Sequence, residues 1–164
     1  MKRTSAYSPP SGRMRNSAKA IVFRDGTVLL VRNRDPLGDF YLLPGGGQEF
    51  GETLMAAAVR ETAEETGLLV RPTRLVLVRE YIGARHEFAL EDCDVHQVES
   101  MFLATLEGES PVPDRVEDEM QVGVEWLPLD RLGAVRIYPS SLARILPGLS
   151  RGELPEPLYL GDVN

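Results

Sequence analysis

The stretch that organises this chain covers residues 45–68 and reads GGGQEFGETLMAAAVRETAEETGL. A glycine turn at its start leads into a helix that we predict over Leu54–Thr66. Thr53 is suited to cap the first turn, because its side chain can accept a hydrogen bond from a free backbone N–H group. Gly67 can adopt the left-handed conformation that ends many helices. The sequence therefore predicts a helix bounded by its own caps, directly after a glycine turn.

Three glutamates gather on one face of this predicted helix. With about 3.6 residues per turn, Glu61, Glu64 and Glu65 fall within an arc of about 100°. Neighbouring carboxylates on such a face lie roughly 5–6 Å apart at Cβ and repel each other by about 3 kcal/mol at an effective dielectric constant of about 20. A bound divalent cation would reverse the sign of that interaction. The glycines leave backbone carbonyl and amide groups exposed beside the acids, where they can bind a metal or a phosphate.

The spacing around these glutamates resembles the signature box of the Nudix hydrolases. Gly46 is followed after five residues by Glu52, and seven further residues lead to RETAEETGL at residues 60–68. The fixed positions of the box match at the right spacing, an agreement that average residue usage would give with odds on the order of one in a million. Thr62 departs from the pattern, because the family usually has an aliphatic residue there, but its γ-methyl can still pack. The resemblance implies an α/β (α+β) fold, a helix–sheet–helix sandwich with the box helix against a mixed β-sheet.

The resemblance also implies roles along the box. Glu64 and Glu65 correspond to metal ligands, and Glu61 corresponds to a ligand or to the group that orients or deprotonates water. The Gly45 carbonyl, just before the box, is a candidate backbone ligand. Arg60 precedes Glu64 by four residues, so we expect an ion pair on the helix and assign Arg60 the role of positioning the acids. The expected cofactor is Mg²⁺, or Mn²⁺ in its place, since such ions prefer oxygen ligands; the number of ions stays open.

Further residues complete the predicted site. Gly46, Glu52 and Gly67 are assigned structural roles, Glu52 because the helix dipole favours an acid near the helix N-terminus. In many members of the family an acid from a distant loop completes the base or the metal set. Glu117 and Glu119, just before a predicted strand, are the candidates here. We place Glu119 in the catalytic set, although the pattern does not separate it from Glu117 and a solvated acidic loop is the alternative.

Four residues outside the box are candidates for substrate binding. Arg32 and Arg34 share one strand parity, so both face a cleft or both face solvent. Tyr41 and its neighbour Phe40 could stack on a base, although aromatic residues at such positions are more often part of the core. His86 lies in a polar loop and could contact a phosphate.

Other catalytic arrangements are not supported by the sequence. His86 and His96 are not spaced as a metal-binding pair, and Cys93 has no catalytic partner nearby in the sequence. A glycosidase-like pair of acids would flank a bond across a cleft instead of stacking on one helical turn. A surface helix with a charged face is the bland alternative, and the glycines, Arg60 and the spacing all speak against it.

Length and composition restrict the class of protein. A chain of 164 residues fits one domain, and 43% hydrophobic and 26% charged residues are ordinary for a globular protein. A net charge of −7 disfavours nucleic acid and anionic membranes as partners, so a phosphate substrate would need a metal as mediator. The sequence has neither a membrane-length apolar run nor a signal-peptide core, and its single Cys93 fits a reducing compartment. We therefore expect a cytoplasmic location.

The rest of the chain is predicted as one domain between two terminal segments. Residues 1–17 are expected to form a flexible arm, residues 18–149 the Nudix-like domain, and residues 150–164 a C-terminal tail. Asp25 and Gly26 predict a β-hairpin turn. The predicted strands cover residues 18–23, 28–33, 40–43, 75–81, 95–107 and 122–127, and a second helix covers residues 140–146 and stops at Pro147 and Gly148.

The expected activity is Mg²⁺-dependent hydrolysis of a phosphoanhydride bond in a nucleoside diphosphate linked to another moiety. The alternative is a sensor domain that binds a nucleotide without cleaving it, and the presence of all three helix glutamates favours catalysis. A third possibility is an oligomeric scaffold with a vestigial site. The expected partner is a small-molecule nucleotide, and a homodimer is possible.

The substrate itself stays open, because loops outside the box set specificity. Gly83 and Ala84 stand where ADP-ribose-cleaving relatives often have a proline. ADP-ribose-like compounds, nucleotide sugars, dinucleoside polyphosphates and damaged nucleoside triphosphates all remain candidates.

Overall fold

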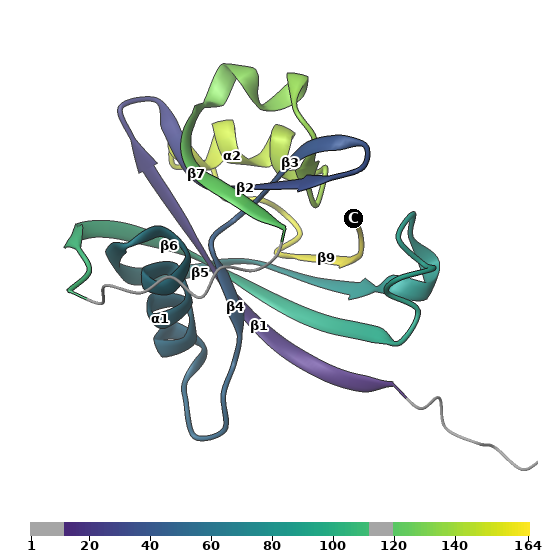
Figure 1. Cartoon of the computed structure of the whole chain (residues 1–164). Coiled ribbons are helices and arrows are strands. Elements are labelled where there is room, and N and C mark those ends of the chain that lie inside the picture. Colours follow the sequence, from purple (N-terminus) through teal and green to yellow (C-terminus); the bar gives the residue numbers. More distant parts are fainter. Residues whose placement is uncertain (1–11, 112–119) are drawn as a thin grey trace, which may run out of the picture.

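The computed structural model describes residues 12–111 and 120–164. Its strands form a mixed sheet, with one helix early in the chain and one late (Figure 1). The strands are β1 (Arg13–Arg24), β2 (Thr27–Asp35), β3 (Gly38–Leu42), β4 (Gly45–Gly47), β5 (Leu68–Ile82), β6 (Val95–Glu109), β7 (Gln121–Pro128), β8 (Ile137–Tyr138) and β9 (Tyr159–Asp162). The helices are α1 (Leu54–Thr66) and α2 (Leu142–Ser150), with short 3₁₀ turns η1 (Gly83–Arg85) and η2 (Leu129–Ala134).

The sheet has the strand order β8-β3-β2-β1-β6-β5-β9, with β4 paired to β1 and β7 paired to β2. The pairs β1–β6, β3–β8 and β5–β9 are parallel, and the other pairs are antiparallel. β1 is the central element, because it contacts β6 on one side and both β4 and β2 on the other. The predicted mixed sheet is confirmed.

The two helices cover opposite faces of the sheet. Ala57 and Ala58 of α1 pack against Ala18 of β1. Side chains alternate between the two faces of a strand, so Ile21 points the other way, and there it shares a core with Leu146 of α2. This arrangement confirms the expected helix–sheet–helix sandwich. In the part of the chain that the structure describes, no helix has the length and apolar character needed to span a bilayer.

The ends of α1 are those that the sequence predicts. The Ala56 N–H donates to the Thr53 hydroxyl at 3.1 Å, so Thr53 is the N-cap. Gly67 ends the helix with φ 69°, and its N–H donates to the Ala63 carbonyl at 2.9 Å. Local signals alone therefore define this helix.

The predicted hairpin between the first two strands is also confirmed. β1 and β2 are antiparallel and meet at Arg24 and Thr27. Asp25 and Gly26 both have positive φ, 48° and 75°, which is the geometry of a type I′ turn.

Two strands begin earlier than the sequence predicts. β1 starts at Arg13, so part of the predicted flexible arm belongs to the sheet, where it pairs with β6 from Val95 onward. β5 starts at Leu68, directly after the helix, although the sequence analysis places it from residue 75. Bulges near Pro72 break the alternation of polar and apolar residues in the first half of β5, which hides the strand from pattern analysis.

The C-terminal region differs from the prediction in two ways. α2 continues through Pro147 to Ser150, because Leu146 and Leu149 on both sides of the proline are buried in the core. Residues 159–162 are not part of an extended tail: they form β9, which pairs with β5. Both corrections arise from packing against distant elements.

Candidate active site

The glycine strand β4 lies directly against β1. Its register pairs Gly45 with Lys19 and Gly47 with Ser17. Gly45 has φ 128°, and a Cβ at this position would lie 2.2 Å from the Ala18 carbonyl oxygen. Only glycine can therefore bring the backbone so close to β1.

Two glutamates of α1 reach β4. A Cβ on Gly46 would lie 2.4 Å from Oε2 of Glu61, so the absence of a side chain makes room for this carboxylate. The Gly45 N–H donates to Oε2 of Glu65 at 2.7 Å. The box helix and the glycine turn are thus in direct contact, and Gly46 leaves the space that the Glu61 carboxylate fills.

Arg60 connects the acids of the box. Its Nε and Nη2 donate to the two carboxylate oxygens of Glu52, each at 3.0 Å, and Nη2 also donates to the Gly47 carbonyl at 2.9 Å. Its Nη1 donates to Glu61 at 2.9 Å and to Glu64 at 3.4 Å. The expected ion pair with Glu64 is present, and the bidentate partner is Glu52.

From the sequence we expect the helix dipole to favour Glu52, whereas the structure gives its carboxylate specific partners. Its carboxylate accepts from Arg60 and from the Glu49 N–H at 3.0 Å. These hydrogen bonds, the one from Arg60 first, hold the pKa of Glu52 below its usual range. Hydrogen bonding to Glu52 correspondingly raises the pKa of Arg60. Glu52 therefore stays ionised and fixes the guanidinium that holds the other acids.

The box offers oxygen donors that suit a hard divalent cation. The donors are the Gly45 carbonyl and the carboxylates of Glu61, Glu64 and Glu65, which face β4 or the Arg60 guanidinium. Within residues 12–111 and 120–164, no three acidic, histidine or cysteine side chains already converge on one point. The donor set fits Mg²⁺ or Mn²⁺ in its chemistry.

The two candidate acids of the distant loop, Glu117 and Glu119, lie outside the described residues. The structure does describe Gln121 at the start of β7, whose Nε2 donates to the Glu65 backbone carbonyl at 2.8 Å. The chain just after Glu119 therefore reaches the C-terminal end of α1. The catalytic role of Glu119 stays a prediction.

Arg32 and Arg34 lie on one face of β2, and both approach Asp39 on β3. The Nε of Arg34 donates to Asp39 at 2.6 Å, whereas Nη1 of Arg32 lies 3.9 Å from it. The hydrogen bond from Arg34 lowers the pKa of Asp39. Both arginines are partly exposed, so they remain candidates for substrate binding, with Asp39 as a competing partner.

Tyr41 and Phe40 lie in the interior. Each is 8% exposed, and the Tyr41 ring belongs to the main hydrophobic core. The Tyr41 hydroxyl donates to Glu125 at 3.0 Å, and burial is the main cause that raises its pKa. The structure thus gives both aromatic residues the core position that the sequence also allows.

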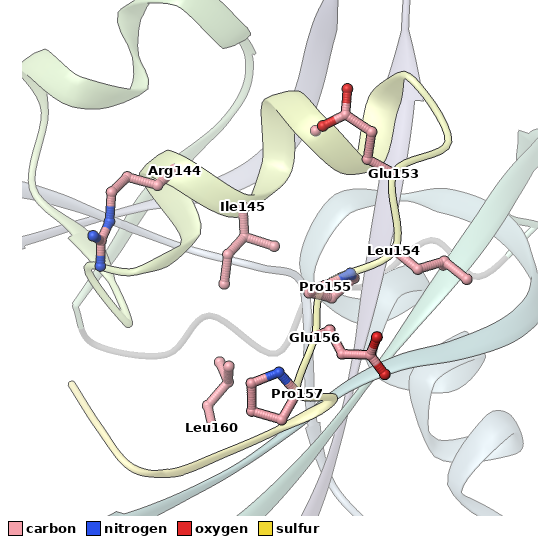
Figure 2. Close-up of a pocket in the computed structure, with 9 residues that line it drawn as sticks. Arg144, Ile145, Glu153, Leu154, Pro155, Glu156, Pro157 and Leu160 are labelled. Carbon is pink, nitrogen blue, oxygen red and sulfur yellow. The ribbon is translucent and has the colours of Figure 1, made fainter.

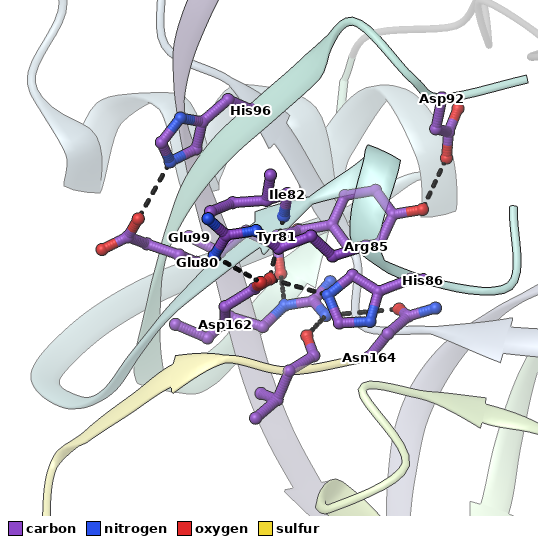
Figure 3. A network of polar contacts seen from close by, with 12 residues as sticks. Glu80, Tyr81, Ile82, Arg85, His86, Asp92, His96, Glu99, Asp162 and Asn164 are labelled. Carbon is purple, nitrogen blue, oxygen red and sulfur yellow. Dashed lines mark hydrogen bonds and ion pairs between the residues drawn. The ribbon is translucent and has the colours of Figure 1, made fainter. Parts of the chain in front are cut away.

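His86 takes part in a polar network at the C-terminal strand (Figure 3). Its Nε2 lies 2.6 Å from Asp162 of β9, and its ring stacks on Tyr81 at 5.2 Å between centroids. Burial alone would raise the pKa of Asp162, but hydrogen bonds from His86 and the Ile82 N–H lower it. His86 therefore joins the loop after β5 to β9. A contact between His86 and a phosphate stays a prediction.

Three charged residues near the box were missed by the sequence analysis. Arg79 of β5 and Glu99 of β6 form a buried ion pair, and the Lys19 ammonium donates to the Gly45 carbonyl. Arg79 and Glu99 gave only a weak signal, because other polar residues such as Glu80 and Gln97 lie beside them in the same strands. Lys19 carried no signal, because its partner is a backbone atom.

A cavity of about 290 Å³ lies between α2 and the segment that leads to β9 (Figure 2). Ile145, Leu154 and Leu160 are among the residues that line it. None of the predicted site residues lines this cavity, so it does not belong to the box.

The chain is similar to known proteins in sequence and in fold. The chain matches the NUDIX domain family over residues 13–149. It is 42% identical over 57 residues to an ADP-ribose pyrophosphatase of Methanocaldococcus jannaschii. The aligned segment covers 34% of this chain and 34% of that protein. It is also 42% identical over 52 residues to an RNA pyrophosphohydrolase of Gluconobacter oxydans. That aligned segment covers 32% of this chain and 31% of the relative. These matches span about a third of the length of both relatives.

Solved structures agree on the architecture. A NUDIX hydrolase from Nitrosomonas europaea superposes with a TM-score of 0.69 at 19% identity, over 87% of this chain and 92% of that chain. At this identity the likeness shows the fold alone. The match over residues 13–149 includes the whole box and strands β1 to β8, and so the chain belongs to the NUDIX domain family.

Proposed function

We propose that this protein is a Mg²⁺-dependent pyrophosphohydrolase that acts on a nucleoside diphosphate linked to another moiety. The observation that carries the proposal is the position of Arg60, which holds Glu52, Glu61 and Glu64 beside the glycine strand. Two curated relatives are named for pyrophosphate chemistry on different substrates, ADP-ribose and RNA. The reaction class is therefore better supported than any one substrate.

In this proposal the metal is held by Gly45, Glu61, Glu64 and Glu65. When bound, such an ion neutralises the diphosphate and lowers the pKa of a water molecule. Arg60 keeps Glu61 and Glu64 in place by donating to both carboxylates. Gly45 fixes Glu65 through its N–H.

The remaining roles concern the attacking water. Glu61 orients it or accepts its proton, and Glu119 is the further acid that completes the base or the metal set. The water oxygen forms a bond to one phosphorus while the bond from that phosphorus to the bridging oxygen breaks. The products are a nucleoside monophosphate and the phosphorylated remainder.

A hydrolysis screen tests the proposal. Wild-type protein with Mg²⁺ is offered ADP-ribose, a nucleotide sugar, a dinucleoside polyphosphate and an RNA with a 5′-triphosphate. Glu64→Gln and Glu65→Gln are expected to lower kcat/KM by on the order of 100-fold or more, because even partners outside the first coordination sphere of a metal contribute up to that much. Glu107→Gln, on the exposed end of β6, is the matched control and should keep wild-type activity.

Two results would contradict the proposal. Wild-type turnover in both box variants would remove the site assignment. Nucleotide binding without turnover of any substrate would favour the sensor alternative.

A further inference from the structure

Lys19 is a cation built into the candidate metal site. It lies on β1, and its Nζ donates to the Gly45 carbonyl oxygen. Within residues 12–111 and 120–164, this oxygen is the only hydrogen-bond acceptor of the Lys19 ammonium. The same oxygen is the backbone ligand in the proposed function.

The neighbouring acid, Glu99, does not accept a hydrogen bond from the Lys19 ammonium. Glu99 lies on the same face of the sheet as Lys19, because its partner in the parallel register is Ser17. One Glu99 oxygen accepts from Arg79 and the other from Gln97 at 2.7 Å. Lys19 is near enough to help lower the pKa of Glu99, after the larger contribution of Arg79, but it forms no hydrogen bond with it. The Glu99 carboxylate therefore stabilises the charge of the Lys19 ammonium through space but forms no hydrogen bond with it.

The pairing of β4 with β1 places Gly45 directly opposite Lys19. Gly45 is pressed against β1, where even a methyl group would collide with Ala18. A divalent cation on the carbonyl oxygen and an ammonium on the same oxygen would repel each other strongly at such short range. The two cations therefore compete for one oxygen.

We propose that Lys19 occupies the Gly45 carbonyl until a metal–nucleotide complex enters, and that its ammonium then moves to a phosphate oxygen of the substrate. This inference rests on the proposed function. It predicts that the protein binds free metal weakly and the metal–nucleotide complex tightly. Lys19 is in this view a residue that couples the binding of metal to the binding of diphosphate.

The chain offers a matched control on the same strand. Arg15 lies on the same face of β1 as Lys19, and its guanidinium packs against Gly47, two residues from Gly45. Arg15→Met therefore removes a positive charge beside β4 without touching the Gly45 carbonyl. Lys19→Met removes the ammonium and keeps the length of the side chain.

The test measures Mn²⁺ binding by the EPR signal of the free ion, with and without adenosine 5′-(α,β-methylene)diphosphate. Without nucleotide, Lys19→Met should bind Mn²⁺ roughly threefold to tenfold more tightly than wild type, the size expected for loss of one partly solvated charge pair. With Mn²⁺ present, the same variant should bind the analogue more weakly. Arg15→Met should leave the affinity for free Mn²⁺ unchanged.

The inference predicts that Lys19→Met binds free Mn²⁺ more tightly and the analogue more weakly. Damage to the fold would instead weaken both affinities. Equal or weaker Mn²⁺ binding by Lys19→Met, with normal binding by wild type, overturns the role of Lys19 alone. No Mn²⁺ binding by wild type, with or without the analogue, overturns the proposed function as well. If Lys19→Met does not fold, Lys19→Gln is measured and judged by the same outcomes.

Discussion

Arg60 shows how one side chain organises the box. Its five N–H groups are shared among three carboxylates and the Gly47 carbonyl. Glu52 is the strongest of these partners, because it accepts on both oxygens. Fixing Glu52 therefore fixes the guanidinium, and the guanidinium in turn sets the positions of Glu61 and Glu64.

The lowered pKa of Glu52 makes its contribution to stability depend on pH. A carboxyl whose pKa is lower in the folded state stabilises the protein above its unfolded pKa, about 4.3 for glutamate, and this contribution is lost as pH falls through the folded value. Glu52→Gln should therefore destabilise the protein at pH 7, and the difference from wild type should shrink as pH falls below about 4. Urea unfolding of both proteins from pH 7 to pH 3 measures this difference.

Glu107→Gln provides the comparison for an exposed pair. Glu107 also has a lowered pKa through Arg71, but both side chains lie at the surface. Exposed pairs contribute little, so this variant should differ from wild type only slightly at any pH. A loss in Glu52→Gln that stays constant down to pH 3 would contradict the role of the Glu52 charge.

At the scale of the element, α1 contains a buried threonine, Thr62, that lowers its stability. This side chain is fully buried, and its hydroxyl has no hydrogen-bond partner among the described residues. A buried hydroxyl without a partner costs about 1–3 kcal/mol. Thr62→Val keeps the shape and removes the hydroxyl, so we expect it to raise the free energy of unfolding by about 1 kcal/mol, measured by urea unfolding.

Thr66, one turn later, gives the opposite expectation for the same substitution. Its hydroxyl donates to the Thr62 carbonyl at 2.6 Å and accepts from the Leu68 N–H at 3.2 Å. Thr66→Val leaves the Leu68 N–H without this acceptor and should lower the free energy of unfolding by about 1–2 kcal/mol. Both substitutions keep the β-branched shape, so they change only the hydrogen bonding of the hydroxyl. Two changes of the same sign would therefore contradict the different roles assigned to the two hydroxyls.

The elements that the sequence predicts correctly are those with local signals. α1 has both caps within its own sequence, and the β1–β2 hairpin has its turn residues. The elements that were missed or cut short depend on distant partners: the start of β1 pairs with β6, and β9 pairs with β5. Hydrogen bonds between strands far apart in the sequence leave no local pattern, so these boundaries could not be predicted.

The site follows the same rule. The contact between Arg60 and Glu64 follows from helical spacing alone, and the structure contains it. The contacts of Lys19 with Gly45, and of His86 with Asp162, join residues from different strands or loops. Burial shows that Tyr41 is a core residue, and burial depends on the packing of the whole core.

At the scale of the whole molecule, the Arg79–Glu99 pair ties three parts of the chain together. Arg79 is 5% exposed and Glu99 is 4% exposed, and they join β5 to β6. Arg79 also donates through Nη1 to the Val163 carbonyl at 2.6 Å, which holds the segment after β9. Burial would raise the pKa of Glu99, but Arg79, Lys19 and Gln97 together lower it. The charge of Glu99 is therefore stabilised by its partners and not by water.

Breaking this pair on one side should destabilise the molecule much more than removing it entirely. Arg79→Met leaves a buried carboxylate without its main partner and is expected to cost about 3–5 kcal/mol at pH 7. The double variant Arg79→Met/Glu99→Leu should recover most of that loss, since apolar side chains of similar volume can replace a buried pair at little cost. In Arg79→Met the pKa of Glu99 should rise, so its deficit against wild type should become smaller as pH falls toward about 4. Urea unfolding of the three proteins at pH 7 and pH 4 measures these differences. A double variant as unstable as Arg79→Met would show that the hydrogen bond to Val163, and not the buried charge, is what holds the C-terminal segment to the sheet.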